Sequence, residues 1–182
     1  MGCAVSNILA TPTSPTTLAD FTSPRLLIPN LSGTDAAAVI QELSQAMRRE
    51  GRVPDLLPFY HAALNREFLV STETEAGMAF PHARIAALQE VSFALGRSRE
   101  PLAWSTRGMG SVRLVFLIAV PANDSTRYLS LISGLARLAK EPQAVEKLYC
   151  ATDPLQMFEV LQQTKLRTSS TAEPIGKAAG QP

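Results

Sequence analysis

The feature that most constrains the fold is an apolar run from Val112 to Val120, which only Arg113 interrupts. Gly110 and Pro121 bound this run. A short segment that is apolar on both faces is typical of a central strand that helices cover on both sides. The run is far shorter than the ~20 residues that a membrane-spanning helix needs. It therefore predicts the core of a sheet, and we expect no direct membrane insertion.

The segments around this run alternate between strand and helix signals. The order of strand, helices, strands and helices predicts an α/β fold, in which a small mixed β-sheet is flanked by α-helices on both faces. On the second helix we expect a buried stripe of Leu57, Tyr60, Leu64 and Phe68. The expected strands are 25–28, 78–80, 91–95 and 112–120. The expected helices begin at a cap at Thr34 or Asp35, at Pro54, at 123–125, at 144 and after a cap at Asp153.

The composition suits one domain with a tail at each end. The chain has 182 residues, of which 46% are hydrophobic and 18% charged. Residues 1–24 and 167–182 are rich in Thr, Ser, Pro and Ala, so we interpret them as a disordered leader and a disordered tail around a domain at 25–166. The start Met1-Gly2-Cys3 fits the pattern of N-terminal lipidation, and the alternative is a permissive sequence without a lipid.

Charge and cysteine usage exclude several classes of function. The 17 basic and 16 acidic side chains leave a formal net charge of +1, which disfavours nucleic acid as a partner. Cys3 and Cys150 lie at opposite ends of the sequence, and His61 and His82 are the two histidines. We therefore expect no metal site, and a reducing, cytoplasmic location.

His82 is the candidate for chemistry. It follows Pro81 at the expected exit of a short strand, and Arg84 stands two residues further on. A neutral imidazole is a nucleophile towards phosphorus, and a guanidinium group can hold phosphoryl oxygens. The alternative is an ordinary histidine beside an arginine. We interpret His61 as an ordinary helical residue and Trp104 as a packing residue.

The residues around His82 give the sequence a family resemblance. The central domain resembles the EIIA components of the bacterial phosphoenolpyruvate-dependent phosphotransferase system, in the fructose/mannitol class that also contains the nitrogen-regulatory EIIA. The matching segments are Arg66-Glu67, Ser71-Thr72, the block from Gly77 to Ala83, Pro101 to Trp104, Val112 to Pro121 and Tyr128 to Lys140.

The resemblance implies a phosphocarrier. His82 would accept a phosphoryl group from HPr or an HPr-like carrier and pass it to an EIIB component, for sugar transport, or use it as a signal to a regulated target protein, as in nitrogen regulation. Arg66 would be the active-site arginine. Ser71, Thr72, Arg84 and Tyr128 are candidate contacts to phosphate or to a partner. The transfer would need no metal or cofactor.

Two departures from the family pattern support an alternative function. Tyr128 stands where the family commonly has a second histidine, and a tyrosine supplies no positive charge near neutrality. Glu73 and Glu75 stand in a loop that is usually glycine-rich, and carboxylates near an incoming phosphate would repel it. The alternative is a non-catalytic regulatory module that uses the EIIA fold to bind another protein.

Overall fold

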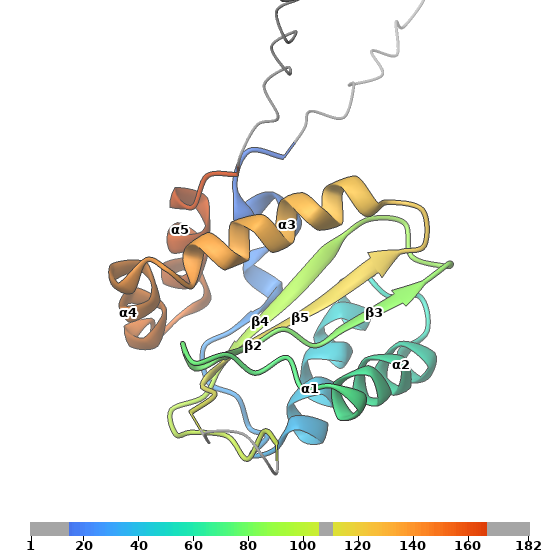
Figure 1. Cartoon of the computed structure of the whole chain (residues 1–182), viewed down its shortest axis with the longest axis horizontal. Helices are drawn as coiled ribbons and strands as arrows, with labels where there is room; N and C mark the ends of the chain where they lie inside the picture. The colour runs from blue at the N-terminus through green and yellow to red at the C-terminus, as the bar shows by residue number, and fades with distance from the viewer. Residues whose placement is uncertain (1–14, 106–110, 167–182) are drawn as a thin grey trace, which may run out of the picture.

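The computed structural model describes residues 15–105 and 111–166, which form a layered α/β domain (Figure 1). The helices are α1 (Ala36–Arg49), α2 (Leu56–Leu69), α3 (Ser125–Leu138), α4 (Pro142–Cys150) and α5 (Pro154–Gln163), with short 3-10 helices η1 (Leu18–Phe21) and η2 (Pro24–Leu26) before them. The strands are β1 (Leu27–Ile28), β2 (Met78–Ala79), β3 (His82–Ile85), β4 (Ser92–Arg97) and β5 (Leu114–Pro121).

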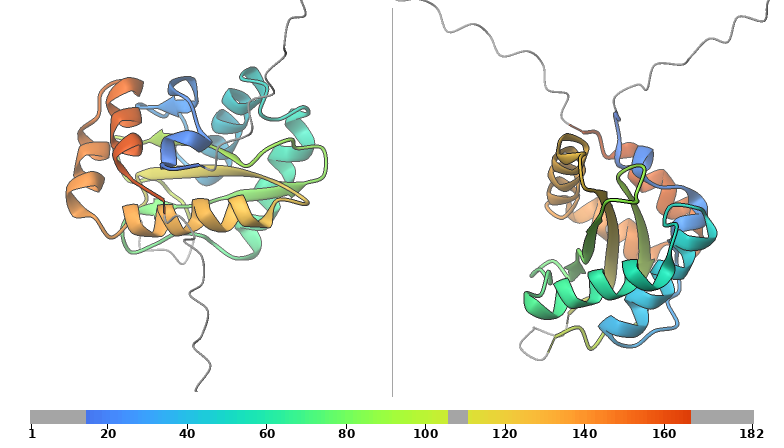
Figure 2. Two further views of the ribbon diagram at one scale, coloured as in Figure 1. Left: turned by 90° about the horizontal axis from the view of Figure 1, so that it is seen from above. Right: turned by 90° about the vertical axis from the view of Figure 1, so that its right-hand side faces the viewer.

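The strand β5 is the centre of a mixed sheet, as its apolar run predicted. It pairs antiparallel with β4 on one side and parallel with β2 and then β3 on the other, while β1 lies parallel to β4 beyond it. All eight residues of β5 are buried. The helix α3 crosses one face of the sheet, and α1 and α2 lie on the other (Figures 1 and 2). The predicted fold class is confirmed.

Alternate side chains of β5 enter two separate hydrophobic clusters, because successive residues of a strand point to opposite faces. The cluster toward α3, α4 and α5 takes Leu114, Phe116, Ile118 and Val120 from β5. The cluster toward α1 and α2 takes Val115, Leu117 and Ala119. Each face of the sheet therefore has its own core.

The edge of the sheet beside β5 is interrupted at Phe80 and Pro81. Before the interruption β2 pairs Ala79 with Val115, and after it β3 pairs His82 with Ile118. A proline has no N–H to donate to a strand ladder, so regular pairing stops there. Its carbonyl still accepts from the Ile118 N–H at 2.9 Å. His82 therefore opens a new strand, rather than standing at the exit of the previous one as we expected.

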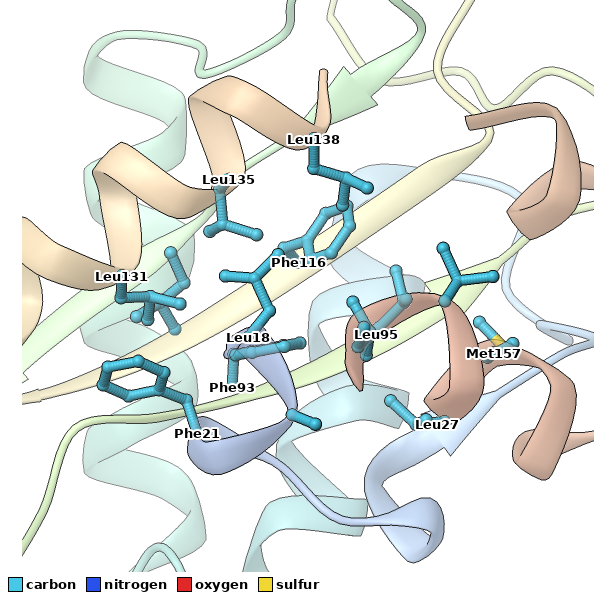
Figure 3. Packing of buried hydrophobic residues seen from close by; sticks show 14 of the residues in the cluster. Leu18, Phe21, Leu27, Phe93, Leu95, Phe116, Leu131, Leu135, Leu138 and Met157 are labelled. Carbon is cyan, nitrogen blue, oxygen red and sulfur yellow. The ribbon is translucent and has the colours of Figure 1, made fainter. Parts of the chain in front are cut away.

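The start of the domain differs from the expected leader, which extended to residue 24. The η1 side chains of Leu18 and Phe21 are 0% and 1% exposed and belong to the cluster under α3 (Figure 3). On α3, a Cβ at Gly134 would lie 2.7 Å from the Leu18 Cδ2 atom, so the glycine permits the close approach. The leader boundary at residue 24 was wrong because these apolar residues pack against elements that are distant in the sequence. Residues 1–14 and 167–182, including Met1-Gly2-Cys3, lie outside the described residues.

The buried face of α2 also differs from the prediction. Leu57 and Phe68 are 63% and 67% exposed, whereas Phe59, Ala63 and Glu67 are buried. These three buried residues are four apart and so share one helix face. The prediction failed because it assigned only apolar residues to the buried face of the helix and so left out Glu67. The core accommodates the carboxylate of Glu67 through hydrogen bonds.

No described helix combines the length and the apolar character that spanning a membrane would require.

We predict that Leu18→Ala lowers the free energy of unfolding by about 3 kcal/mol, because it removes a fully buried side chain and leaves a cavity. Urea denaturation of the full chain measures the change. Leu155→Ala is the matched control, because Leu155 is 62% exposed, and its effect should stay below about 0.5 kcal/mol. Equal effects of the two substitutions would show that the segment around Leu18 does not contribute to the core.

Candidate functional site

The imidazole of His82 lies on the α3 side of the sheet. Its Cα is in register with Ile118, whose side chain belongs to the cluster on that side. The Nδ1 atom lies 3.1 Å from the carbonyl oxygen of Phe80. Because a carbonyl oxygen only accepts hydrogen bonds, Nδ1 must carry the proton in this contact. In the neutral ring, Nε2 then has the free lone pair.

Tyr128 and Arg84 lie beside this imidazole. The ring of Tyr128, in the first turn of α3, has its centroid 6.2 Å from that of His82. Arg84 is two residues beyond His82 on β3, and so on the same face. Its guanidinium carbon lies 5.8 Å from the centre of the Tyr128 ring, and its Nη1 donates to the Ala122 carbonyl at 3.3 Å. These three side chains form one cluster at the edge of the sheet.

Arg66 comes from the other helical layer. It stands in the last turn of α2, and its Nη1 donates to the Val70 carbonyl at 2.9 Å. No hydrogen bond joins it to His82 among the residues that are described. The contact to Val70 leaves four of the five guanidinium N–H groups for other partners.

Glu67 is the hydrogen-bonding centre behind the site, and sequence reasoning gave it no role. It is 3% exposed, and its Oε1 accepts from the Trp104 indole N–H at 2.8 Å and from the Thr72 backbone N–H at 2.7 Å. The hydroxyls of Ser71 and Thr72 donate to Oε1 and Oε2 at 3.2 and 2.7 Å. A buried carboxylate needs such donors, because water does not reach it. One sequence signal could have revealed this role: Glu67 is a charged residue four positions after Ala63, and so on the buried face of α2.

The hydroxyls of Ser71 and Thr72, which we expected to contact phosphate or a partner, are engaged within the loop. Ser71 Oγ accepts from the Glu73 N–H at 3.2 Å, and Thr72 Oγ1 accepts from the Phe80 N–H at 2.9 Å. The carboxylate of Glu73 bonds to the Ser105 hydroxyl at 3.0 Å, and Glu75 is exposed.

The end of this loop is anchored at Gly77, which has a φ of 70°. This left-handed backbone conformation favours glycine, and a Cβ there would also lie 2.6 Å from the Tyr149 hydroxyl. That hydroxyl donates to the Ala76 carbonyl at 3.1 Å. Burial raises the pKa of Tyr149, which favours the protonated form that donates. The polar loop before β2 is thus held at both of its ends.

No group of three or more His, Cys, Asp or Glu side chains that could hold a metal ion occurs within residues 15–105 and 111–166. The cluster offers an unprotonated imidazole nitrogen, a tyrosine hydroxyl and an arginine. This set can accept a phosphoryl group and bind its oxygens.

The chain matches the family model "Phosphoenolpyruvate-dependent sugar phosphotransferase system, EIIA 2" over residues 20–164. The match covers most of the chain, so the chain belongs to this family of EIIA proteins.

Its relatives include sugar-specific and nitrogen-regulatory proteins. The PTS 2-O-alpha-mannosyl-D-glycerate-specific EIIABC component of Escherichia coli is 29% identical over 134 residues, which are 72% of this chain and 20% of that protein. The chain thus spans about a fifth of the length of that relative. The nitrogen regulatory protein of Bradyrhizobium diazoefficiens is 25% identical over 144 residues, which are 79% of this chain and 94% of that protein. These relatives support a phosphocarrier or regulatory role.

The fold is also that of a solved EIIA structure. Enzyme IIAMTL from Escherichia coli, solved in complex with phosphorylated enzyme IIBMTL, superposes with a TM-score of 0.66 at 18% identity. The superposition covers 77% of this chain and 96% of that one.

We predict that Trp104→Phe lowers the free energy of unfolding by about 2 kcal/mol, because it removes one hydrogen bond to the buried Glu67 carboxylate. Denaturation followed by circular dichroism measures it. Tyr60→Phe is the control, since it removes a hydroxyl from a half-buried tyrosine of the same core layer. If Trp104→Phe lowers the free energy of unfolding no more than this control does, the indole N–H does not stabilise the fold through Glu67.

Proposed function

We propose that the chain is a phosphocarrier that accepts a phosphoryl group on His82 Nε2 from an HPr-like protein. It passes the group to an EIIB component or uses it as a regulatory signal. The observation that carries this proposal is the contact of His82 Nδ1 with the Phe80 carbonyl, which leaves Nε2 with the lone pair. We place this activity in the cytoplasm, whose reducing conditions suit the free thiol of Cys150.

The transfer exchanges one N–P bond for another. The Nε2 lone pair of His82 attacks the phosphorus of the carrier's phosphohistidine, and the electrons of the breaking bond return to the carrier's ring nitrogen. When the other nitrogen of the carrier's ring bears a proton, the carrier leaves as neutral imidazole. The positive charge then lies on the ring of His82, where the Phe80 carbonyl stabilises it through Nδ1–H.

The negative charge of the phosphoryl oxygens needs donors from this chain. Arg84 supplies a positive charge on the same face of β3 as His82, and Tyr128 supplies one hydroxyl donor. Arg66 is the second guanidinium, which we propose reaches the phosphoryl group from the end of α2 around the edge of the sheet. Ser71 and Thr72 contribute by holding the loop that precedes β2.

A solved relative supports the proposed acceptor. Enzyme IIAMTL binds phosphorylated enzyme IIBMTL, and we propose an EIIB component as the acceptor here as well. An HPr-like carrier is the proposed donor.

A regulatory module is the second candidate function, and two observations favour it. The nitrogen regulatory protein matches along 94% of its own length, and Tyr128 offers no charge for transfer. In this case the EIIA fold binds a regulated target protein, and binding does not depend on phosphate at His82.

We predict that incubation with enzyme I, phosphoenolpyruvate and HPr-type carriers places acid-labile phosphate on His82. His82→Ala should abolish the label, whereas His61→Ala should keep it, because His61 lies exposed on α2. Mass spectrometry at neutral pH and scintillation counting measure the label. No label with any carrier would contradict the proposal, and partner binding that is equal for wild type and His82→Ala would then favour the regulatory module.

We predict that Arg84→Gln slows phosphoryl acceptance by about tenfold, because a charge-assisted hydrogen bond to the transferring group is lost. Rapid-quench kinetics with the phosphorylated carrier measure the rate. Arg99→Gln removes the same charge from an exposed position just after β4 and is the control for a general electrostatic effect. Equal slowing by both substitutions would show that Arg84 acts only through net charge.

A further inference from the structure

Hydrogen bonds connect the buried carboxylate of Glu67 to the imidazole of His82. The Thr72 hydroxyl donates to Glu67 Oε2 at 2.7 Å and accepts from the Phe80 N–H at 2.9 Å. The Phe80 carbonyl in turn accepts from His82 Nδ1 at 3.1 Å. Thr72 is the middle of this chain, and its side chain is the link to both neighbours.

Glu67 sets the direction of these bonds. An ionised carboxylate only accepts, so the Thr72 hydroxyl has to direct its proton toward Glu67 and its lone pairs are left for the Phe80 N–H. The burial of Glu67 keeps water from replacing the Thr72 hydroxyl at the carboxylate. The orientation of the Thr72 hydroxyl is therefore determined by the carboxylate.

The backbone at Phe80 depends on this hydroxyl, because Phe80 makes no backbone hydrogen bond to β5. Pro81 donates no hydrogen bond, and its carbonyl is fixed by the Ile118 N–H. The Phe80 ring stacks on Phe116 with centroids 5.4 Å apart. On the N-terminal side, the bond to Thr72 is what satisfies the Phe80 N–H and holds the residue whose carbonyl faces His82.

We propose that Thr72, oriented by Glu67, is a positioning residue for His82: it holds the Phe80 carbonyl so that Nδ1 carries the proton and Nε2 has the lone pair. Thr72 acts through the backbone and needs no contact with the phosphoryl group. The proposal rests on the proposed function of His82 for its biological meaning. The tautomer itself can be measured without any carrier protein.

The test is the tautomer of His82 in the full chain labelled with ¹⁵N, from long-range ¹H–¹⁵N correlation spectra at a pH where both imidazoles are neutral. His61, the second histidine and exposed on α2, is the internal reference. In the wild type we expect His82 to be mainly protonated on Nδ1, unlike His61. An Nε2-protonated His82 in the wild type overturns the proposal without any variant.

Three substitutions test the link to Thr72. Thr72→Val removes the hydroxyl at nearly constant shape, and we expect the Nδ1-protonated fraction of His82 to fall toward that of His61. Thr72→Ser should restore it. Thr74→Val is the matched control, because Thr74 bonds the Met78 carbonyl in the same loop and makes no bond to Phe80. An unchanged His82 tautomer in folded Thr72→Val, or an equal change in Thr74→Val, overturns the proposal.

Kinetics separate this proposal from the proposed function. We expect Thr72→Val to slow phosphoryl acceptance by about tenfold, from misplacement of the nucleophile, and Thr72→Ser to restore most of the rate. The His82 tautomer could depend on Thr72 while the protein accepts no phosphoryl group. That result would refute the proposed phosphocarrier function and support the positioning role of Thr72. Phosphorylation of His82 at an unchanged rate in Thr72→Val would refute the positioning alone.

Discussion

The double burial of β5 is the constraint on which the rest of the domain depends. Its eight side chains are all buried, and both of its edges are paired. A strand that is apolar on both faces is stable only when each face is covered, so the chain must supply a helical layer on either side. The segment between β1 and β2 provides α1 and α2, and the segment after β5 provides α3, α4 and α5. The 3-10 helix η1 packs on the α3 side of the sheet and completes the hydrophobic cluster there.

His82, the proposed phosphoryl acceptor, lies where this regular arrangement stops. Pro81 breaks the pairing between β2 and β3, and His82 follows it directly. An interrupted edge leaves backbone groups that need other partners. The loop before β2 supplies one of them, the Thr72 hydroxyl, and the His82 ring lies against the Phe80 carbonyl. The break in the sheet and the orientation of the imidazole are therefore parts of one hydrogen-bonding arrangement.

Local signals in the sequence predicted the helices and the strands β4 and β5, whereas β3 was not expected and part of the expected first strand is the 3-10 helix η2. Asp153 caps α5 through side-chain bonds to backbone N–H groups, as expected. Of the alternatives that the sequence left open, Asp35 rather than Thr34 caps α1, and Asp124 among residues 123–125 caps α3. Two predictions failed for a shared reason. Leu18 in a polar leader and Glu67 on a helix both have surroundings built from residues that are distant in the sequence. Neither periodicity nor composition contains that information.

The sequence by itself determined the order of the elements, the double coverage of the central strand and the identity of His82 as the candidate nucleophile. Hydrophobic period, capping and proline chemistry act over a few residues, so they can be read along the chain. Only the tertiary structure decided that Tyr128 and Arg84 lie beside His82, that Arg66 comes from the opposite layer, and that Nδ1 of His82 faces the Phe80 carbonyl. These depend on strand register and on buried hydrogen bonds between separate segments, which form only when the chain folds.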